Sequence, residues 1–411
     1  LGSLITVPGI RADAIKEYLS NALGDSFNLF SSFTGGSFDQ MSIFALNVTP
    51  YITASIVIQL LTMIIPSLER LAKEGGEVGR QKMNKYTKVL SLVLALIEAT
   101  GLYLTYKGQN VFVDNTALTG MLLILSLVTG TSILMWLGEQ ITQKGIGNGI
   151  SVLILVGILA RVPSAIQTIA KLIVNNGVFS TTGLITALGI IIGAIILVAA
   201  VVFVQNAERR IPVQYSKKVV GRKMVGAQNT HIPLKPAMAG VMPIIFASSF
   251  MTFPAMIIQM FNSNIATQTG FWNVVYKFSL ATSSSSVGIG YSIVNAIVYL
   301  LLIVGFTFFY TYATFNPAEV SANIKRNGGF IPGIRAGKPT TDYLSSVVGK
   351  LTIFGGIYLA IIAILPMFMR FTSLDVTFGG TSILIVVGVA LETVQQLESH
   401  LVMRHYKGFL E

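Results

Sequence analysis

Nine long stretches of this chain are apolar and almost free of charge, which restricts it to helices that span a lipid bilayer. Each stretch has about 20 residues, the length that a helix needs to cross a hydrocarbon core of about 30 Å. Only 11% of the 411 residues are charged, whereas a soluble domain carries about 25%. The predicted spans lie near residues 42–65, 87–106, 118–137, 150–170, 183–205, 237–260, 291–315, 344–369 and 379–397. The sequence therefore predicts an all-α polytopic membrane protein.

The distribution of basic residues predicts the orientation of these spans. Of the 28 lysines and arginines, 21 fall in alternate connections, beginning with the one after the first span and ending with the C-terminal tail. Connections rich in Lys and Arg stay in the cytoplasm, so we expect a cytoplasmic C-terminus. Nine spans would then leave the N-terminus outside. We therefore expect ten helices in all, with residues 1–7 as the outer end of a first helix that is largely missing here.

Two pairs of segments in the chain resemble each other. Residues 48–55 match residues 241–248 at five of eight positions, and residues 149–157 match residues 380–388 at six of nine. In a count of ten spans, both pairs are five spans apart. An odd offset gives the two halves opposite orientations, which is an inverted repeat. Chance similarity between apolar segments is the alternative.

The repeat divides the predicted bundle into two inverted five-helix halves. The N-terminal half covers residues 1–206, with its repeat ending near residue 175, and the C-terminal half covers residues 176–411. Two long basic loops, 206–236 and 316–342, interrupt the C-terminal part. Their charge either controls topology or docks an acidic protein or RNA. The candidates for docking are Arg209, Arg210, Lys217, Lys218, Arg222, Lys223 and Arg335. Glycines and Pro332 around Arg335 are turn residues that would hold this arginine at a fixed tip.

The repeated segments carry isoleucines at equivalent positions. These are Ile52, Ile154, Ile245 and Ile385. An inverted repeat places a pathway at the interface of its halves. An apolar ring there would dewet and exclude ions, while still yielding to a bulky chain. Val48 and Ile150 lie one helical turn before Ile52 and Ile154 and would share their faces. The alternative is that these side chains belong to an ordinary core or face lipid.

The sequence predicts no enzymatic activity, no metal site and no cofactor. It contains no GxxxxGK[ST] loop, no HExxH motif and no cysteine, so nucleotide hydrolysis and zinc-dependent hydrolysis are not expected within this chain. Glu98 lies inside a predicted span, where a carboxylate should face a polar cavity or a neighbouring helix. A secondary transporter usually needs several such groups, so it is the less favoured alternative. An insertase without a through-pore is a third hypothesis.

Several segments resemble the SecY family of protein-conducting channels. Residues 41–61, MSIFALNVTPYITASIVIQLL, resemble its first signature, and residues 305–320, which end in TYATFNPAEV, resemble its second. Residues 227–235 and 330–335 also resemble family segments, and the similarity runs along the whole chain. It implies an hourglass channel in a bacterial cytoplasmic membrane. Such a channel translocates unfolded preproteins and releases apolar segments sideways into lipid.

The resemblance also implies roles for individual residues and partners. The family's pore ring falls on Val48, Ile52, Ile150, Ile154, Ile245 and Ile385. Its plug falls on about residues 31–42, including Ser31, Phe33, Gly35, Gly36, Phe38 and Ser42. Its lateral gate falls on Thr53, Glu98 and Phe253. The implied partners are the SecE and SecG subunits, the motor ATPase SecA, the ribosome, preproteins with signal sequences, and membrane lipids, and the basic loops would dock SecA and the ribosome.

Overall fold

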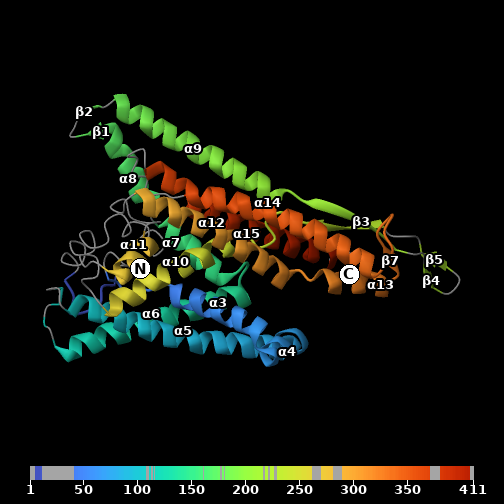
Figure 1. The fold of residues 1–411 in the computed structure, drawn as a ribbon, viewed down its shortest axis with the longest axis horizontal. Helices are drawn as coiled ribbons and strands as arrows, with labels where there is room; N and C mark the ends of the chain where they lie inside the picture. Colours follow the sequence, from blue (N-terminus) through green and yellow to red (C-terminus); the bar gives the residue numbers. More distant parts are fainter. Residues whose placement is uncertain are drawn as a thin grey trace.

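A computed structural model of the chain is a bundle of long helices with a small sheet at one end (Figure 1). It describes residues 5–11, 41–107, 111–112, 114, 116–160, 162–175, 178–179, 181–215, 218–220, 223–225, 229–261, 270–280, 289–370 and 380–407. The helices are α3 (Thr49–Ile64), α4 (Pro66–Glu74), α5 (Gly76–Lys107), α6 (Ala117–Lys144), α7 (Gly149–Leu159), α8 (Val162–Ile173), α9 (Thr181–Asn206), α10 (Met242–Phe261), α11 (Phe271–Leu280), α12 (Ile289–Thr314), α13 (Pro317–Arg326), α14 (Lys338–Arg370) and α15 (Gly380–Lys407). The strands are β1 (Val174–Asn175), β2 (Val178–Phe179), β3 (Arg209–Tyr215), β4 (Lys218–Val220), β5 (Lys223–Val225), β6 (Asn229–Leu234) and β7 (Gly329–Phe330).

Each of the nine predicted spans contains a helix. Among the described residues, six helical segments are long and apolar enough to cross a bilayer, and they lie along α5, α6, α9, α12 with α13, α14 and α15. A seventh candidate is the pair α3 and α4, which bends by 107° at its break. Helices α7 and α10 are also apolar, but their apolar segments are shorter than those of the six candidate spans. The prediction of a polytopic, predominantly helical membrane protein is confirmed.

Two of the predicted boundaries were wrong for local reasons. The stretch predicted at 150–170 is split into α7 and α8, because Pro163 in the first turn of α8 has no N–H and cannot continue a helix from the preceding turn. The stretch predicted from residue 42 becomes helical only at Thr49. Met41 and Asn47 have φ angles of 42° and 50°, which are incompatible with a right-handed helix.

The two basic loops fold into one unit that we call the sheet unit, comprising β3, β6, β7 and α13. Strand β3 pairs antiparallel with β6 on one side and with β7 on the other. Alternate side chains of β3, Ile211 and Val213, are buried. They join Leu234, Ile324 and Leu344 in one apolar cluster, so the first turns of α14 also pack against the sheet unit. The two basic segments predicted as loops thus contain regular secondary structure and pair with each other.

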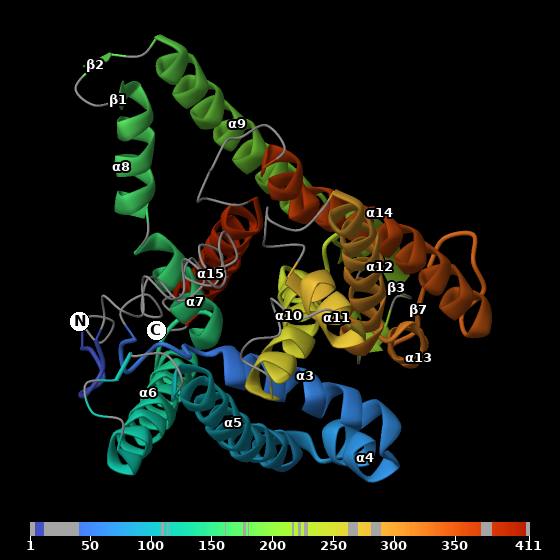
Figure 2. The ribbon, with the colours of Figure 1, turned by 60° about the vertical axis from the view of Figure 1, so that its left-hand side comes forward.

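Most of the helices form two groups, and a further set of helices lies between these groups. Helices α3, α4, α5 and α6 gather on one side, and α9, α12 and α14 lie on the other (Figure 2). Helices α7, α10 and α15 lie between them. Helix α10 packs against α12 in one group and against α5 and α3 in the other, and α15 packs against α7, α9 and α14. The middle helices thus connect both groups.

Removing the side chain of Leu344 should destabilise the junction between α14 and the sheet unit. Leu344 is 0% exposed, and truncating a buried leucine costs about 2–5 kcal/mol. We expect Leu344→Ala to lower the thermal unfolding temperature of the detergent-purified protein. Ile357→Ala is the control, because Ile357 lies on the same helix but is 49% exposed. Equal melting temperatures for the two variants would contradict the packing described here.

Candidate functional site

The six residues of the predicted ring lie in one apolar cluster, which we call the central cluster. Val48, Ile154 and Ile385 are 2%, 7% and 1% exposed. The other three side chains are half-buried and pack against the same cluster: Ile52, Ile150 and Ile245. They come from the start of α3 and from α7, α10 and α15, so both halves of the repeat contribute. The structure thus brings these residues together, and their role as a pore ring stays a prediction.

The starts of α3 and α10 position three of these side chains in the same way. Each helix has a proline in its first turn, Pro50 in α3 and Pro243 in α10, where the missing N–H costs nothing. The N–H of Ile52 donates to the carbonyl of Val48 at 3.0 Å. The N–H of Ile245 donates to the carbonyl of Val241 at 3.4 Å. The aligned isoleucines therefore sit one turn inside each helix.

The start of α7 is fixed by a cap and by two close contacts. Asn148 caps the helix, with its Oδ1 accepting from the N–H of Ile150 at 3.1 Å. Gly149 lies so close to the carbonyl of Gly138 on α6 that no side chain would fit. The N–H of Gly147 donates to Oε1 of Gln396 on α15 at 2.8 Å. This turn therefore ties α7 to α6 and to α15.

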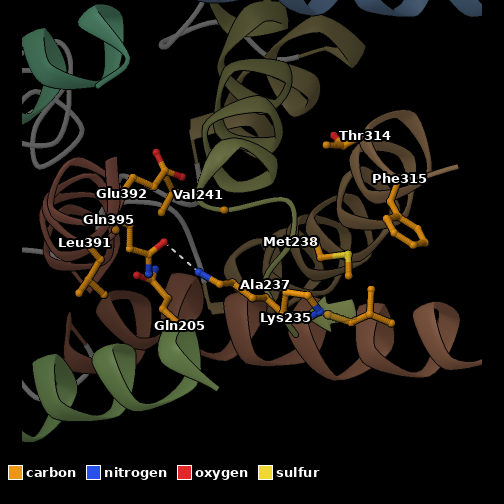
Figure 3. Close-up of a pocket in the computed structure, with 14 residues that line it drawn as sticks. Gln205, Lys235, Ala237, Met238, Val241, Thr314, Phe315, Leu391, Glu392 and Gln395 are labelled. Atoms are coloured by element: carbon orange, nitrogen blue, oxygen red, sulfur yellow. Dashed lines mark hydrogen bonds between the residues drawn. The ribbon is translucent and has the colours of Figure 1, made fainter. Parts of the chain in front are cut away.

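A pocket of about 370 Å³ lies beside the central cluster, at the end nearer the sheet unit. Figure 3 shows Glu392 and Gln395 projecting from α15 toward the connection between β6 and α10. Lys235 on that connection donates a hydrogen bond to Oε1 of Gln395 at 2.8 Å. Val241 and Gly388 also line the pocket. The boundary of the central cluster is therefore polar on this side.

The three predicted gate residues lie on three helices that pack together. Thr53 is on α3, Glu98 on α5 and Phe253 on α10, and α10 packs against both other helices. The hydroxyl of Thr53 donates to the carbonyl of Thr49 at 3.1 Å. One carboxylate oxygen of Glu98, Oε2, is buried and accepts no hydrogen bond from the described part of the chain. Phe253 is 41% exposed.

Most of the predicted plug lies outside the described residues. This applies to Ser31, Phe33, Gly35, Gly36 and Phe38. Ser42 is described and is 0% exposed. It forms an isolated antiparallel bridge with Thr6, and the N–H of the next residue, Ile43, donates to the carbonyl of Ile5 at 3.0 Å. Ser42 is therefore held against the N-terminal segment.

The predicted docking residues of the first basic loop lie on and beyond the sheet unit. Arg209 and Arg210 are exposed residues of β3, and Arg210 pairs with Glu208 at 3.5 Å. Lys218 and Lys223 are residues of the small β4–β5 hairpin. This hairpin extends beyond the helices (Figure 1). Lys217 and Arg222 lie outside the described residues.

The segment around Arg335 is held at both ends and presents the arginine to solvent. Thr340 donates a hydrogen bond to the carbonyl of Arg335 at 2.9 Å, and Ser321 donates to the carbonyl of Gly337 at 2.9 Å. Ile331 anchors the start of the segment in the apolar cluster of the sheet unit. Gly333 and Gly337 have φ angles of 82° and 107°, which favour glycine. Arg335 itself is exposed.

Sequence reasoning missed that the two basic loops share one sheet. Gln214 of the first loop pairs with Phe330 of the second, so Arg209, Arg210 and Arg335 belong to a single folded unit. The spacing of Ile211 and Val213, with Arg210, Pro212 and Gln214 at the positions between and beside them, was the available signal, because it has the period of a half-buried strand. No residue pattern indicated the hydrogen bonds of Gln395 with Lys235 and of Gln396 with Gly147.

Known proteins resemble this sequence along most of its length. The sequence model of the SecY family matches residues 42–394. Protein translocase subunit SecY of Streptomyces coelicolor is 43% identical, covering 100% of this chain and 93% of the relative. The subunit of the same name from Mycobacterium bovis is 41% identical with the same coverage.

Two solved structures share the fold at low sequence identity. "The structure of a protein conducting channel" matches with a TM-score of 0.64 at 22% identity, covering 97% of this chain and 93% of that one. Sec61 in the canine ribosome–channel complex from the endoplasmic reticulum matches with a TM-score of 0.62 at 20% identity, covering 98% and 89%. The family match spans most of the described helices, and the relatives align over the whole chain. This multi-pass α-helical membrane protein therefore belongs to the SecY family.

Proposed function

We propose that this chain forms the gated pore of a protein translocase in a bacterial cytoplasmic membrane, with its C-terminus in the cytoplasm. Unfolded preproteins would cross through the pore, and apolar segments would leave it sideways into lipid. The observation that carries the proposal is the central cluster, in which branched side chains from four helices meet. Membership of the SecY family favours this function over a secondary transporter.

The chemistry of the central cluster suits a seal that opens for a polypeptide. Apolar walls hold water poorly, so a narrow apolar constriction excludes ions by dewetting. The ring side chains of Val48, Ile52, Ile150, Ile154, Ile245 and Ile385 carry no polar atoms, so parting them breaks no hydrogen bond. They would close around an extended chain of any sequence. The energy for movement would come from a partner ATPase.

The side exit would lie where α10 packs against α3 and α5, with Thr53, Glu98 and Phe253 along it. Glu98 weakens an otherwise apolar contact between helices, because its buried Oε2 accepts no hydrogen bond from the described residues and burying an unsatisfied polar atom is costly. An apolar segment of a substrate could replace these contacts at little cost. This supports a gate at the interface of these helices.

The sheet unit is the proposed docking surface for SecA and the ribosome. Arg209, Arg210 and Arg335 are exposed on one folded unit, which suits a partner with acidic groups or phosphates. Lys217, Lys218, Arg222 and Lys223 would extend this basic surface. The structural relative Sec61 was solved in a ribosome–channel complex. SecE and SecG would accompany the chain in the membrane, and residues 31–42 would plug the pore.

Polar substitutions in the ring should break the seal. We expect Ile385→Asn combined with Ile154→Asn to raise ion conductance and to relax the requirement for a functional signal sequence, because amide side chains hydrate the constriction. The measurement is the conductance of the purified complex in planar bilayers. Ile385→Leu combined with Ile154→Leu is the control and should stay tight. Wild-type conductance in the double asparagine variant would show that these residues form no seal.

Reversing the charge at Arg335 should separate docking from topology. We expect Arg335→Glu to insert normally, because orientation depends on the number of basic residues nearby, yet to lose most SecA-driven import of a preprotein into vesicles. Arg335→Lys should also be impaired, since a lysine cannot copy the paired hydrogen bonds of a guanidinium. Lys338→Glu is the exposed control on the same segment. Protease mapping verifies orientation, and near-normal import by Arg335→Glu would refute the docking role.

A further inference from the structure

Val241, the residue directly before α10, faces Gly388 of α15. A methyl carbon placed on Gly388 would lie 2.9 Å from Cγ1 of Val241, closer than two carbon atoms pack at their optimal separation of about 3.5–4.0 Å. Val241 is 4% exposed and belongs to the central cluster. Glycine is less favourable than alanine inside a helix, so its small size at this position serves the packing of the two helices.

This contact lies one helical turn from two members of the proposed ring. Val241 precedes Ile245 by four residues, and Gly388 follows Ile385 by three. Side chains three or four positions apart stack on one helix face. The distance between α10 and α15 at Gly388 therefore helps to set the distance between Ile245 and Ile385.

The same two positions occur in the internal repeat, but the halves use them differently. Val241 corresponds to Val48, and Gly388 corresponds to Gly157. Val48 belongs to the proposed ring, whereas Val241 is packed against the backbone of α15. The C-terminal half thus contributes one residue of α10 to the ring and uses the preceding turn to hold that helix in place.

We propose that Gly388 and Val241 are positioning residues of the seal: the bare glycine lets α10 approach α15 until Ile245 and Ile385 close the pore. The inference rests on the proposed function as a gated pore. Valine is stiff about χ1, so Val241 cannot turn away from an added methyl group. The neighbouring Gln205, whose Nε2 would lie 3.2 Å from that methyl carbon, is a flexible side chain and can move. An added methyl group therefore separates the two helices.

The test is the ion conductance of Gly388→Ala in planar bilayers. We expect a rise of roughly tenfold over the wild type, as overpacking of a close contact shifts a closed–open equilibrium by about that factor. The matched control is Gly305→Ala, because Gly305 is also inside a span, but beyond its own helix backbone no atom of the described residues lies within 4 Å of an added methyl carbon. Val241→Phe fills the same contact from α10 and should also raise conductance.

Rescue distinguishes positioning from general damage to the fold. In Val241→Ala/Gly388→Ala, the space freed on α10 accommodates the added methyl group, so conductance should return to that of Val241→Ala alone. Failure of this rescue, or equal conductance of Gly388→Ala and Gly305→Ala while the double variant Ile154→Asn/Ile385→Asn leaks, would overturn the inference alone. A tight Ile154→Asn/Ile385→Asn channel would overturn the proposed function and this inference with it.

Discussion

Close packing of helix against helix is the interaction on which this structure depends. In a bilayer the hydrophobic effect does not drive helices together, because lipid tails are as apolar as leucine, and small residues that allow close approach take its place. Gly149 of α7 rests on the carbonyl of Gly138, and Gly355 of α14 rests on the carbonyl of Pro236. Helix α9, by contrast, exposes Ile195 and Phe203 to 63% and 78%, as expected for a surface in contact with lipid. The fold thus combines tight internal contacts with an apolar exterior.

The contacts between the helices of the central cluster differ in kind from those at its edge. The apolar side chains of the central cluster meet through van der Waals contact alone, which is weak for each atom pair and re-forms without a directional requirement. At the edge, Lys235 is bonded to Gln395, and the backbone of Gly147 is bonded to Gln396. Separating the polar groups costs more, because each would need a new partner. The helices therefore separate more easily at the central cluster than at the hydrogen-bonded contacts along its edge.

The membrane part of this fold could be predicted from sequence because the bilayer imposes a length and a composition that are visible in a single chain. The repeat also indicated which isoleucines would share a surface, since Ile52, Ile154, Ile245 and Ile385 all lie in or against the central cluster. The sheet unit could not be predicted in this way. The pattern around Ile211 and Val213 indicates strand β3, but the pairing of Gln214 with Phe330 is a contact between segments more than a hundred residues apart. Whether Val241 and Gly388 are in close contact depends on differences in distance of a few tenths of an ångström, and no residue pattern indicates such differences.

The pairing of β3 with β7 has a consequence for how the protein is made. A chain emerges from its N-terminus during synthesis, so β3 and β6 are complete long before β7 appears. Helices α10, α11, α12 and α13 lie between β6 and β7 in sequence, so all four are synthesised before Phe330 can pair with Gln214. Until then, one edge of β3 has unpaired backbone groups and Ile211 lacks the cover of α13 and α14. A nascent or truncated chain that stops before residue 329 therefore lacks β7 and Arg335, although Arg209 and Arg210 on β3 are already present.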